Sequence, residues 1–231
     1  MNADSAYVVP AEPRPTARVE GSTLLWPIRR VLCVGRNYAD HAREMGGDPD
    51  REAPFFFTKP ADAVVPAAGG VAYPPLTHDL QHEVELVVAI ARPLAGASRA
   101  EAVAAIFGYA VGVDLTRRDL QNEAKELRRP WDGGKAFDQS APMSPLVPLP
   151  RELSSGRIWL SVNGELRQEA DLADMIWPVA DIIAFASASI RLLPGDLIFT
   201  GTPAGVSPLH PGDAVTGGVA GVAEFSFEIS A

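Results

Sequence analysis

The strongest hydrophobic pattern in the chain is the run from Val84 to Ile90, which is rich in β-branched residues. Such a run predicts a largely buried β-strand. Glu83 comes directly before this run and Glu85 lies within it. Because side chains two residues apart on a strand point to the same face, the pattern predicts that the two carboxylates lie together at the mouth of the strand.

A third carboxylate, Asp114, ends the second apolar run, GYAVGVD. Like charges held close together among apolar neighbours repel and lose hydration, so a buried set is expected to keep a proton or to hold a cation. With no Cys or His at metal-binding spacing, the three residues favour Mg²⁺, Mn²⁺ or Ca²⁺ over Zn²⁺. The alternative is that Glu83 and Glu85 lie on a solvent-exposed strand face and bind no ion.

Shorter apolar runs predict further strands. Alternating residues on both sides of Asn163 and Gly164 predict a β-hairpin, because this dipeptide favours the tight turn between two strands. The C-terminal segment also alternates, which predicts a second hairpin. Other strands are expected at residues 30–34 and 54–60 and from Leu197.

Four segments have the features of helices, at residues 38–45, 98–106, 116–127 and 179–192. Ser98 and Glu101 have the spacing of a capping box, and Pro178 is placed to begin the last helix. The segment 131–145 is rich in glycine and proline and is predicted to be an irregular loop. Many short strands with a few helices predict an α+β fold that is mainly β.

Composition limits the classes of function. At 231 residues with 47% hydrophobic residues, the chain is expected to form an N-terminal arm, residues 1–23, and one catalytic domain, residues 24–231. The net charge of −9 argues against nucleic acid or an anionic membrane surface as a partner, so an anionic substrate would need local positive charge. Because the sequence shows no signal peptide or membrane-spanning run, a cytoplasmic location is expected. Cys33, the single cysteine, is expected in the core.

Seven segments, in order, resemble the fumarylacetoacetate hydrolase family over about residues 28–225. These segments are VGRNYADHAREMG, PFFFTKP, HEVELVVAI, GYAVGVDLTRRDLQ, PWDGGKAFDQSAPMSP, VNGELRQ and PGDLIFTGTPAGV. The resemblance implies a β-roll of mixed sheets with peripheral helices, a homodimer, and Mg²⁺ or Mn²⁺ held by Glu83, Glu85 and Asp114.

The resemblance also implies roles for other residues. His41 and Glu44 would lie on a segment that closes over the substrate and would activate water. Without the resemblance, the residues alone favour a role for His41 in capping its helix. The family positions that contact the substrate acid correspond to Arg118, Gln121, Lys135 and Thr202.

The implied activity is metal-dependent hydrolysis of the C–C bond of a 2,4-dioxo acid. The expected substrate is fumarylpyruvate, an intermediate of gentisate degradation. Lys135 is the expected donor to the developing negative charge, helped by Gln121 and by backbone N–H groups of residues 200–202. Asp138 is either a residue that orients Lys135 or a surface residue. The distal carboxylate has four unranked candidate partners, Arg36, Arg43, Arg128 and Arg129.

Three alternatives stay open. The same site could decarboxylate or tautomerise oxaloacetate, or it could act as a general acylpyruvase. The third possibility is a non-catalytic protein that binds a divalent cation for structural reasons only.

Overall fold

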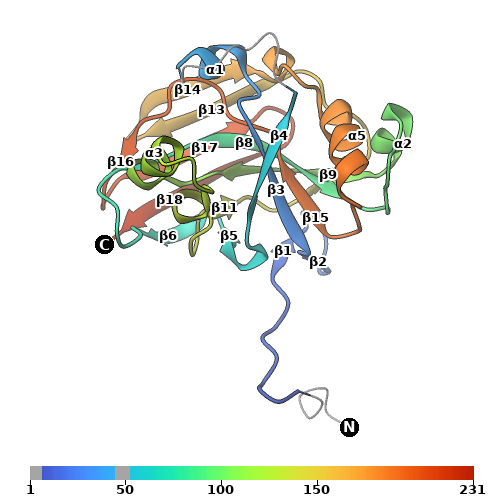
Figure 1. Ribbon diagram of the computed structural model, residues 1–231, viewed down its shortest axis with the longest axis horizontal. Helices are drawn as coiled ribbons and strands as arrows, with labels where there is room; N and C mark the ends of the chain where they lie inside the picture. The colour runs from blue at the N-terminus through green and yellow to red at the C-terminus, as the bar shows by residue number, and fades with distance from the viewer. Residues whose placement is uncertain (1–6, 45–52) are drawn as a thin grey trace.

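A computed structural model describes residues 7–44 and 53–231 of the chain, and strands dominate it (Figure 1). This confirms the predicted α+β, mainly β fold. The strands are Thr16–Arg18 (β1), Leu25–Pro27 (β2), Arg30–Gly35 (β3), Phe55–Lys59 (β4), Val64–Pro66 (β5), Ala68–Ala72 (β6), Leu80–Gln81 (β7), Val84–Ile90 (β8), Ile106–Val113 (β9), Thr116–Arg117 (β10), Ala141–Met143 (β11), Val147–Pro148 (β12), Arg157–Val162 (β13), Glu165–Asp171 (β14), Asp196–Phe199 (β15), Pro208–Leu209 (β16), Ala214–Val219 (β17) and Ala223–Ser230 (β18).

Two large sheets form the body of the molecule. The larger has the strand order β4-β3-β15-β8-β9-β11-β5, with β12 also paired to β9, and mixes parallel and antiparallel neighbours. The other has the order β14-β13-β17-β18-β6. Two small sheets, β10-β7-β16 and β1-β2, complete the fold. The curled arrangement agrees with the expected β-roll.

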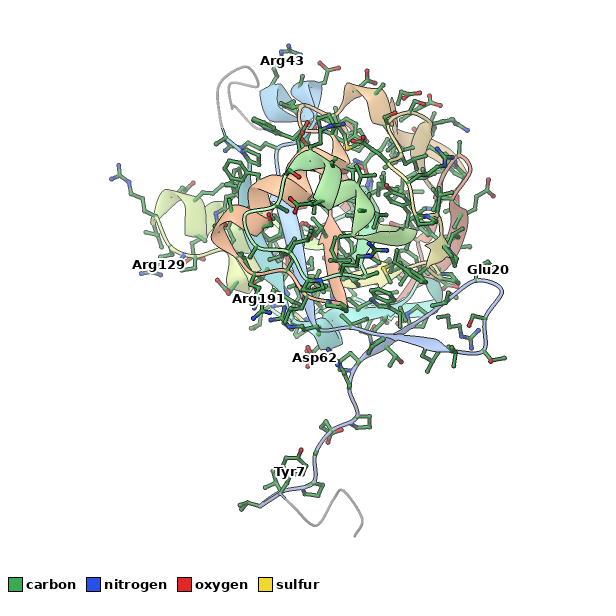
Figure 2. The ribbon with its side chains drawn as sticks, turned by 90° about the vertical axis from the view of Figure 1, so that its right-hand side faces the viewer. Tyr7, Glu20, Arg43, Asp62, Arg129 and Arg191 are labelled. Carbon is green, nitrogen blue, oxygen red and sulfur yellow. The ribbon has the colours of Figure 1, made fainter. Side chains whose placement is uncertain are left out.

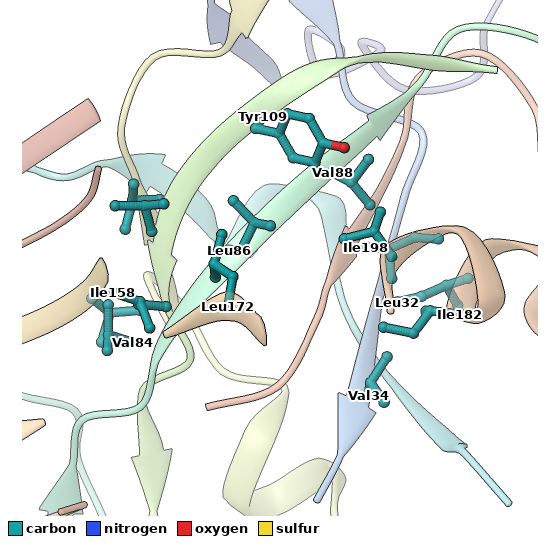
Figure 3. Close-up of a cluster of buried hydrophobic side chains, with 14 of the residues drawn as sticks. Leu32, Val34, Val84, Leu86, Val88, Tyr109, Ile158, Leu172, Ile182 and Ile198 are labelled. Atoms are coloured by element: carbon teal, nitrogen blue, oxygen red, sulfur yellow. The ribbon is translucent and has the colours of Figure 1, made fainter. Parts of the chain in front are cut away.

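The main core is built on one face of β8. Val84, Leu86 and Val88 point to this face and pack with residues of the five-stranded sheet and of the helix Val179–Ser189 (α5) (Figure 3). Val87 and Ala89 point to the other face and join a smaller core covered by β1 and β2. The pleat of a strand thus sends alternate side chains into two cores, and Glu85 belongs to the second face.

The helices lie around the sheets (Figure 1). The Ser98 side chain accepts from the Glu101 backbone while the Glu101 carboxylate accepts from the Ser98 backbone, which confirms the capping box. The Asn163-Gly164 hairpin is also confirmed, with positive φ at both residues. The other α-helices are Ala39–Glu44 (α1), Arg99–Ala104 (α2), Arg118–Glu126 (α3) and Asp132–Lys135 (α4), and the short 3₁₀ turns are Ala61–Ala63 (η2) and Leu172–Asp174 (η3).

Several predicted boundaries were wrong, and strand pairing explains most of them. The helix expected from Thr116 begins at Arg118, because residues 116–117 pair with β7 as β10. The helix expected to reach residue 192 ends at Ser189, because Leu192 is extended and forms a bridge with Leu94. The predicted end of the first helix at Met45 lies outside the described residues.

The segment 131–145 is not an irregular loop throughout. It contains the one-turn helix α4 and the strand β11, which pairs in parallel with β5 and antiparallel with β9. Residues 7–15, before β1, extend away from the body (Figure 1). The predicted arm boundary at residue 23 falls between β1 and β2, which pair as a hairpin. In residues 7–44 and 53–231, no helix combines the length and the apolar character needed to cross a membrane.

Candidate active site

Three carboxylates lie together at the point where the central strand β8 begins and its neighbour β9 ends. Glu83 precedes β8, Glu85 is its second residue, and Asp114 follows the last residue of β9. The two strands are antiparallel neighbours, and the Asp114 N–H donates to the Glu83 carbonyl over 2.8 Å. One oxygen from each residue lies within 4.8 Å of the others, and all three side chains are buried. Strand pairing therefore brings together the residues that the sequence pattern singled out.

Three buried cations surround this carboxylate cluster. Lys135, at the end of α4, donates from Nζ to Glu83 Oε2 (2.7 Å) and Asp114 Oδ2 (2.8 Å), and also to the Thr116 hydroxyl (2.6 Å). The Arg118 guanidinium forms a hydrogen-bonded ion pair with Glu83. Lys59 Nζ lies 2.8 Å from Asp114 Oδ1. Three negative side chains are thus matched by three positive ones.

The protonation of these groups follows from burial and from their neighbours. Burial raises the pKa of Glu85, and the charges of Asp114 and Glu83 raise it further. Burial also acts to raise the pKa of Glu83, but Lys135 and Arg118 more than offset it and hold that pKa below its usual range. For Lys135, burial acts to lower the pKa, while Asp114 and Glu83 outweigh burial and raise it.

The donor set fits a hard divalent cation. Asp114 Oδ1 is buried and has no aligned hydrogen bond, because its contact with Lys59 meets the distance of an ion pair but not the geometry of a hydrogen bond. The Glu85 carboxylate accepts from the Gly201 N–H over 2.7 Å, and burial beside Asp114 and Glu83 raises the pKa of Glu85, a shift that a bound cation would oppose. Carboxylate oxygens without sulfur or imidazole at the same point are the ligands preferred by Mg²⁺, Mn²⁺ and Ca²⁺.

A histidine and a glutamate lie beside the cluster on α1. His41 is buried and lines the same cavity as Glu83 and Glu85. Its Nδ1 lies 3.3 Å from Glu44 Oε2, and Glu44 is 40% exposed. Because a carboxylate only accepts, this contact places the proton on Nδ1 and leaves Nε2 as a base. Burial lowers the pKa of His41, although Glu83 and Glu44 act against this shift.

The residues expected to contact the substrate acid line the same cavity. Arg118 donates to Gln81 and to Gln121, whose Oε1 lies 2.6 Å from Arg118 Nη1. The Thr202 hydroxyl accepts from the Gln168 amide over 2.8 Å. The structure therefore places Glu83, Glu85, His41 and all four expected substrate contacts around one cavity, while Asp114 is buried beside it against Lys135 and Lys59.

The geometry bears on two further expectations from the sequence. Of the two roles left open for Asp138, the surface role agrees with its exposure, and the Lys135 backbone carbonyl is held by Lys59 (2.5 Å) and Ser140 (3.1 Å). The N–H groups of Thr200 and Gly201 are engaged by Leu86 and Glu85, so neither is available to an oxyanion. The Thr200 N–H extends the pairing of the sheet, and the Gly201 N–H orients the Glu85 carboxylate.

Sequence reasoning assigned no role to Lys59 or Gln168. Lys59 closes the strand β4 and binds two backbone carbonyls as well as Asp114, and Gln168 connects the His82 ring, the Val84 N–H and Thr202. The position of Lys59 at the end of an aromatic strand was the one sequence feature that could have indicated its role. The polar strand that contains Gln168 has no feature that would have indicated a role for this residue.

Comparison with known proteins agrees with this architecture. Residues 30–230 match the family model described as Fumarylacetoacetate (FAA) hydrolase C-terminal. A mitochondrial oxaloacetate tautomerase from Bos taurus is 40% identical over 203 residues, which cover 87% of this chain and 91% of that protein. A fumarylpyruvate hydrolase from Ralstonia sp is 43% identical over 183 residues, or 79% and 95% of the two chains.

A solved structure gives the same result in three dimensions. The crystal structure of fumarylpyruvate hydrolase from Pseudomonas aeruginosa, in complex with Mn²⁺ and pyruvate, superposes with a TM-score of 0.94 at 45% identity. The match covers 97% of this chain and 99% of that one. With a family model that spans nearly the whole chain and relatives of this similarity, the chain belongs to the fumarylacetoacetate hydrolase family.

Proposed function

We propose that this protein hydrolyses the C–C bond of a 2,4-dioxo acid, with fumarylpyruvate as the substrate and fumarate and pyruvate as products. The observation that carries the proposal is the placement of His41, in contact with Glu44, on the cavity that Glu83 and Glu85 line. The Ralstonia and Pseudomonas relatives named fumarylpyruvate hydrolase support this substrate.

The charges of the site suit a dianionic substrate. Glu83, Glu85 and Asp114 would hold Mg²⁺ or Mn²⁺, which when bound supplies a Lewis acid for the oxygens of a 2-oxo acid. When ionised, these three carboxylates are balanced by Lys59, Lys135 and Arg118. A divalent cation therefore adds two positive charges that a dianion can neutralise.

The protein groups then divide the chemistry as follows. His41 Nε2 takes a proton from a water molecule, and the resulting oxygen nucleophile attacks the C4 carbonyl of the substrate. When the tetrahedral adduct collapses, the C3–C4 bond breaks and its electron pair leaves with the pyruvate fragment. The proton held by His41 returns to C3 of that fragment. Glu44 orients the ring and stabilises its charged form during this cycle.

Lys135 and Gln121 are the groups available to the developing oxyanion. In the structure, Lys135 Nζ makes three hydrogen bonds, to Glu83, Asp114 and Thr116. Donation to the substrate would therefore require a substrate oxygen to replace one of these partners. Until then the buried ammonium group stabilises the ionised carboxylates.

A second candidate reaction is tautomerisation of oxaloacetate, which is the named activity of the bovine relative. That reaction moves a proton between carbon and oxygen of a 2-oxo acid and needs no activated water. The same cavity would serve, but the requirement for His41 and Glu44 would differ. Mutation of Glu44 therefore separates the two candidates.

The test follows the loss of ultraviolet absorbance of fumarylpyruvate, acetylpyruvate and oxaloacetate, with and without EDTA. We expect rapid hydrolysis of fumarylpyruvate that EDTA abolishes, and a fall of about 10²-fold or more in the Glu44→Ala protein. Turnover that survives metal removal would contradict the proposal. An equal loss of hydrolysis and tautomerisation in Glu44→Ala would show that Glu44 does not act through water activation.

A further inference from the structure

One face of α3 lines the cavity from the carboxylate cluster outward. Arg118, Gln121 and Lys125 follow one another at three- and four-residue spacing, which places them on one side of the helix. All three line the cavity. Arg118 binds Glu83 at the inner end, and the helical rise places Lys125 about 10 Å further along the axis. Lys125 therefore marks the outer end of the cavity.

Lys125 lies beside Trp131, and a series of contacts continues from that ring to Phe55 and then to Arg36. The Lys125 Nζ lies 5.4 Å from the centroid of the Trp131 ring. Trp131 meets Phe55 edge-on, with centroids 5.5 Å apart and ring planes at 83°. The Arg36 guanidinium carbon lies 5.9 Å from the Phe55 centroid. These four residues line the outer part of the cavity, so positive charge and aromatic surface lie together there.

Among residues 7–44 and 53–231, Lys125 has no negative partner of its own. Within the described parts of the chain, no carboxylate lies at ion-pair distance from its Nζ. Burial, together with the charges of Arg118 and Arg36, lowers the pKa of Lys125 to about 8. Of the described residues that line the cavity, the carboxylates are Glu83 and Glu85, at its inner end. A ligand anion at the outer end would stabilise the charged form of Lys125.

The structure also ranks the arginines that sequence alone leaves equal. Arg36 lines the cavity, at a φ of 56° that is uncommon for a residue other than glycine. Arg43 and Arg129 lie at the edge of the molecule with their side chains directed outward (Figure 2). Arg128 is exposed and does not line this cavity, and Arg129 lines an adjoining hollow instead.

We propose that Lys125 and Arg36 form a second anion subsite, which binds the distal carboxylate of an unsaturated dioxo diacid while Phe55 and Trp131 contact its carbon chain. This inference rests on the proposed function and names what that function leaves open, the group that distinguishes fumarylpyruvate from acylpyruvates with no second carboxylate. Selectivity for a diacid then comes from the distance between two anion-binding positions on one face of α3, Arg118 at the inner end and Lys125 at the outer end.

The test compares two inert ligands on the metal-loaded protein by calorimetry. The pair is 2-oxoheptanedioate and 2-oxoheptanoate, which have equal chain length and differ in the distal carboxylate. We expect the wild-type protein to bind the diacid more tightly. The Lys125→Met variant, which keeps the aliphatic stem, should lower that preference by about tenfold, the effect typical of a lost charge-assisted hydrogen bond. The ratio of kcat/KM for fumarylpyruvate to that for acetylpyruvate should fall in parallel.

The matched control is Arg128→Asn, which removes an exposed positive charge just after the same helix. Asn suits this position because Arg128 has a φ of 54°, which Asn tolerates. The control should keep the wild-type preference. Equal binding of the two acids by the wild type, failure to bind either, or an unchanged preference in Lys125→Met would overturn the subsite, as would an equal loss in the control.

The outcomes separate the subsite from the reaction. A diacid preference that Lys125→Met removes, in a protein that turns over no dioxo acid, would reject the proposed hydrolysis and support the subsite. Hydrolysis of fumarylpyruvate with an unchanged substrate ratio in Lys125→Met would support the hydrolysis and reject the subsite.

Discussion

At the scale of single residues, the buried charges explain both the geometry and the stability of the site. Lys59 has its side chain fully buried and holds the backbone carbonyls of Leu115 and Lys135 while pairing with Asp114. One lysine thus fixes a carboxylate and the segment that carries the opposing Lys135. An isolated buried ammonium would be costly, so this arrangement is stable only because every partner is present.

The Lys59→Met variant tests this positioning role. Removal of one member of a buried ion pair leaves the Asp114 charge less compensated, takes the Lys59 donor from the Leu115 carbonyl and leaves the Lys135 carbonyl with Ser140 alone. We therefore expect a loss of about 3–5 kcal/mol in the free energy of unfolding. Urea unfolding followed by circular dichroism measures it. The matched control is Lys125→Met, at a half-buried lysine that forms no ion pair with any residue the structure describes, and the expected change there is within about 1 kcal/mol. Similar values for both variants would contradict the role given to Lys59.

Sequence predicted the carboxylate cluster because two local rules place it. Strand alternation brought Glu83 and Glu85 together, and the end of the next strand supplied Asp114. The partners of Lys59 are backbone groups more than fifty residues away, so no local pattern could identify it. The outer subsite could not be predicted from local sequence either. Arg36 and Lys125 are far apart in the chain, and they line one cavity only because the end of β3 and α3 both border it.

At the scale of elements, local chemistry determined which boundaries could be predicted. The capping box at Ser98 and the Asn163-Gly164 turn depend on residues within four positions of each other, and both are present. Helix α4 and strand β11 depend on distant partners. A Cβ on Gly134 would lie 2.9 Å from the Gln121 Cβ, so glycine is what lets α4 pack against α3. The glycines of this segment therefore predicted a loop, but Gly134 is needed for the close packing of α4 against α3.

The capping box predicts a measurable contribution from α2. In Ser98→Ala the Glu101 N–H loses its side-chain acceptor, and we expect the free energy of unfolding to fall by about 1 kcal/mol. Urea unfolding measures the change. Ser155→Ala is the control, since Ser155 is exposed in an irregular segment, and it should match the wild type. Equal stability of Ser98→Ala and the control would show that the box contributes nothing to this helix.

At the scale of the whole molecule, an acidic protein carries a positively lined cavity. The chain has a net charge of −9, yet Arg36, Arg118, Lys125 and Lys135 line the cavity that also holds Glu83 and Glu85. The overall charge argues against polyanionic partners, while the local charges favour a small dianion together with a divalent cation. The fold makes this separation possible because the central strands bring carboxylates to one point and α3 and α4 bring cations around it.

The most direct test of this account is an anomalous difference map from crystals of the protein grown with Mn²⁺. The account predicts one strong peak at the carboxylate cluster, coordinated by Glu83, Glu85 and Asp114, and no such peak in crystals of Asp114→Asn. A peak bound elsewhere, or no peak at the cluster in protein that still hydrolyses fumarylpyruvate, would contradict it.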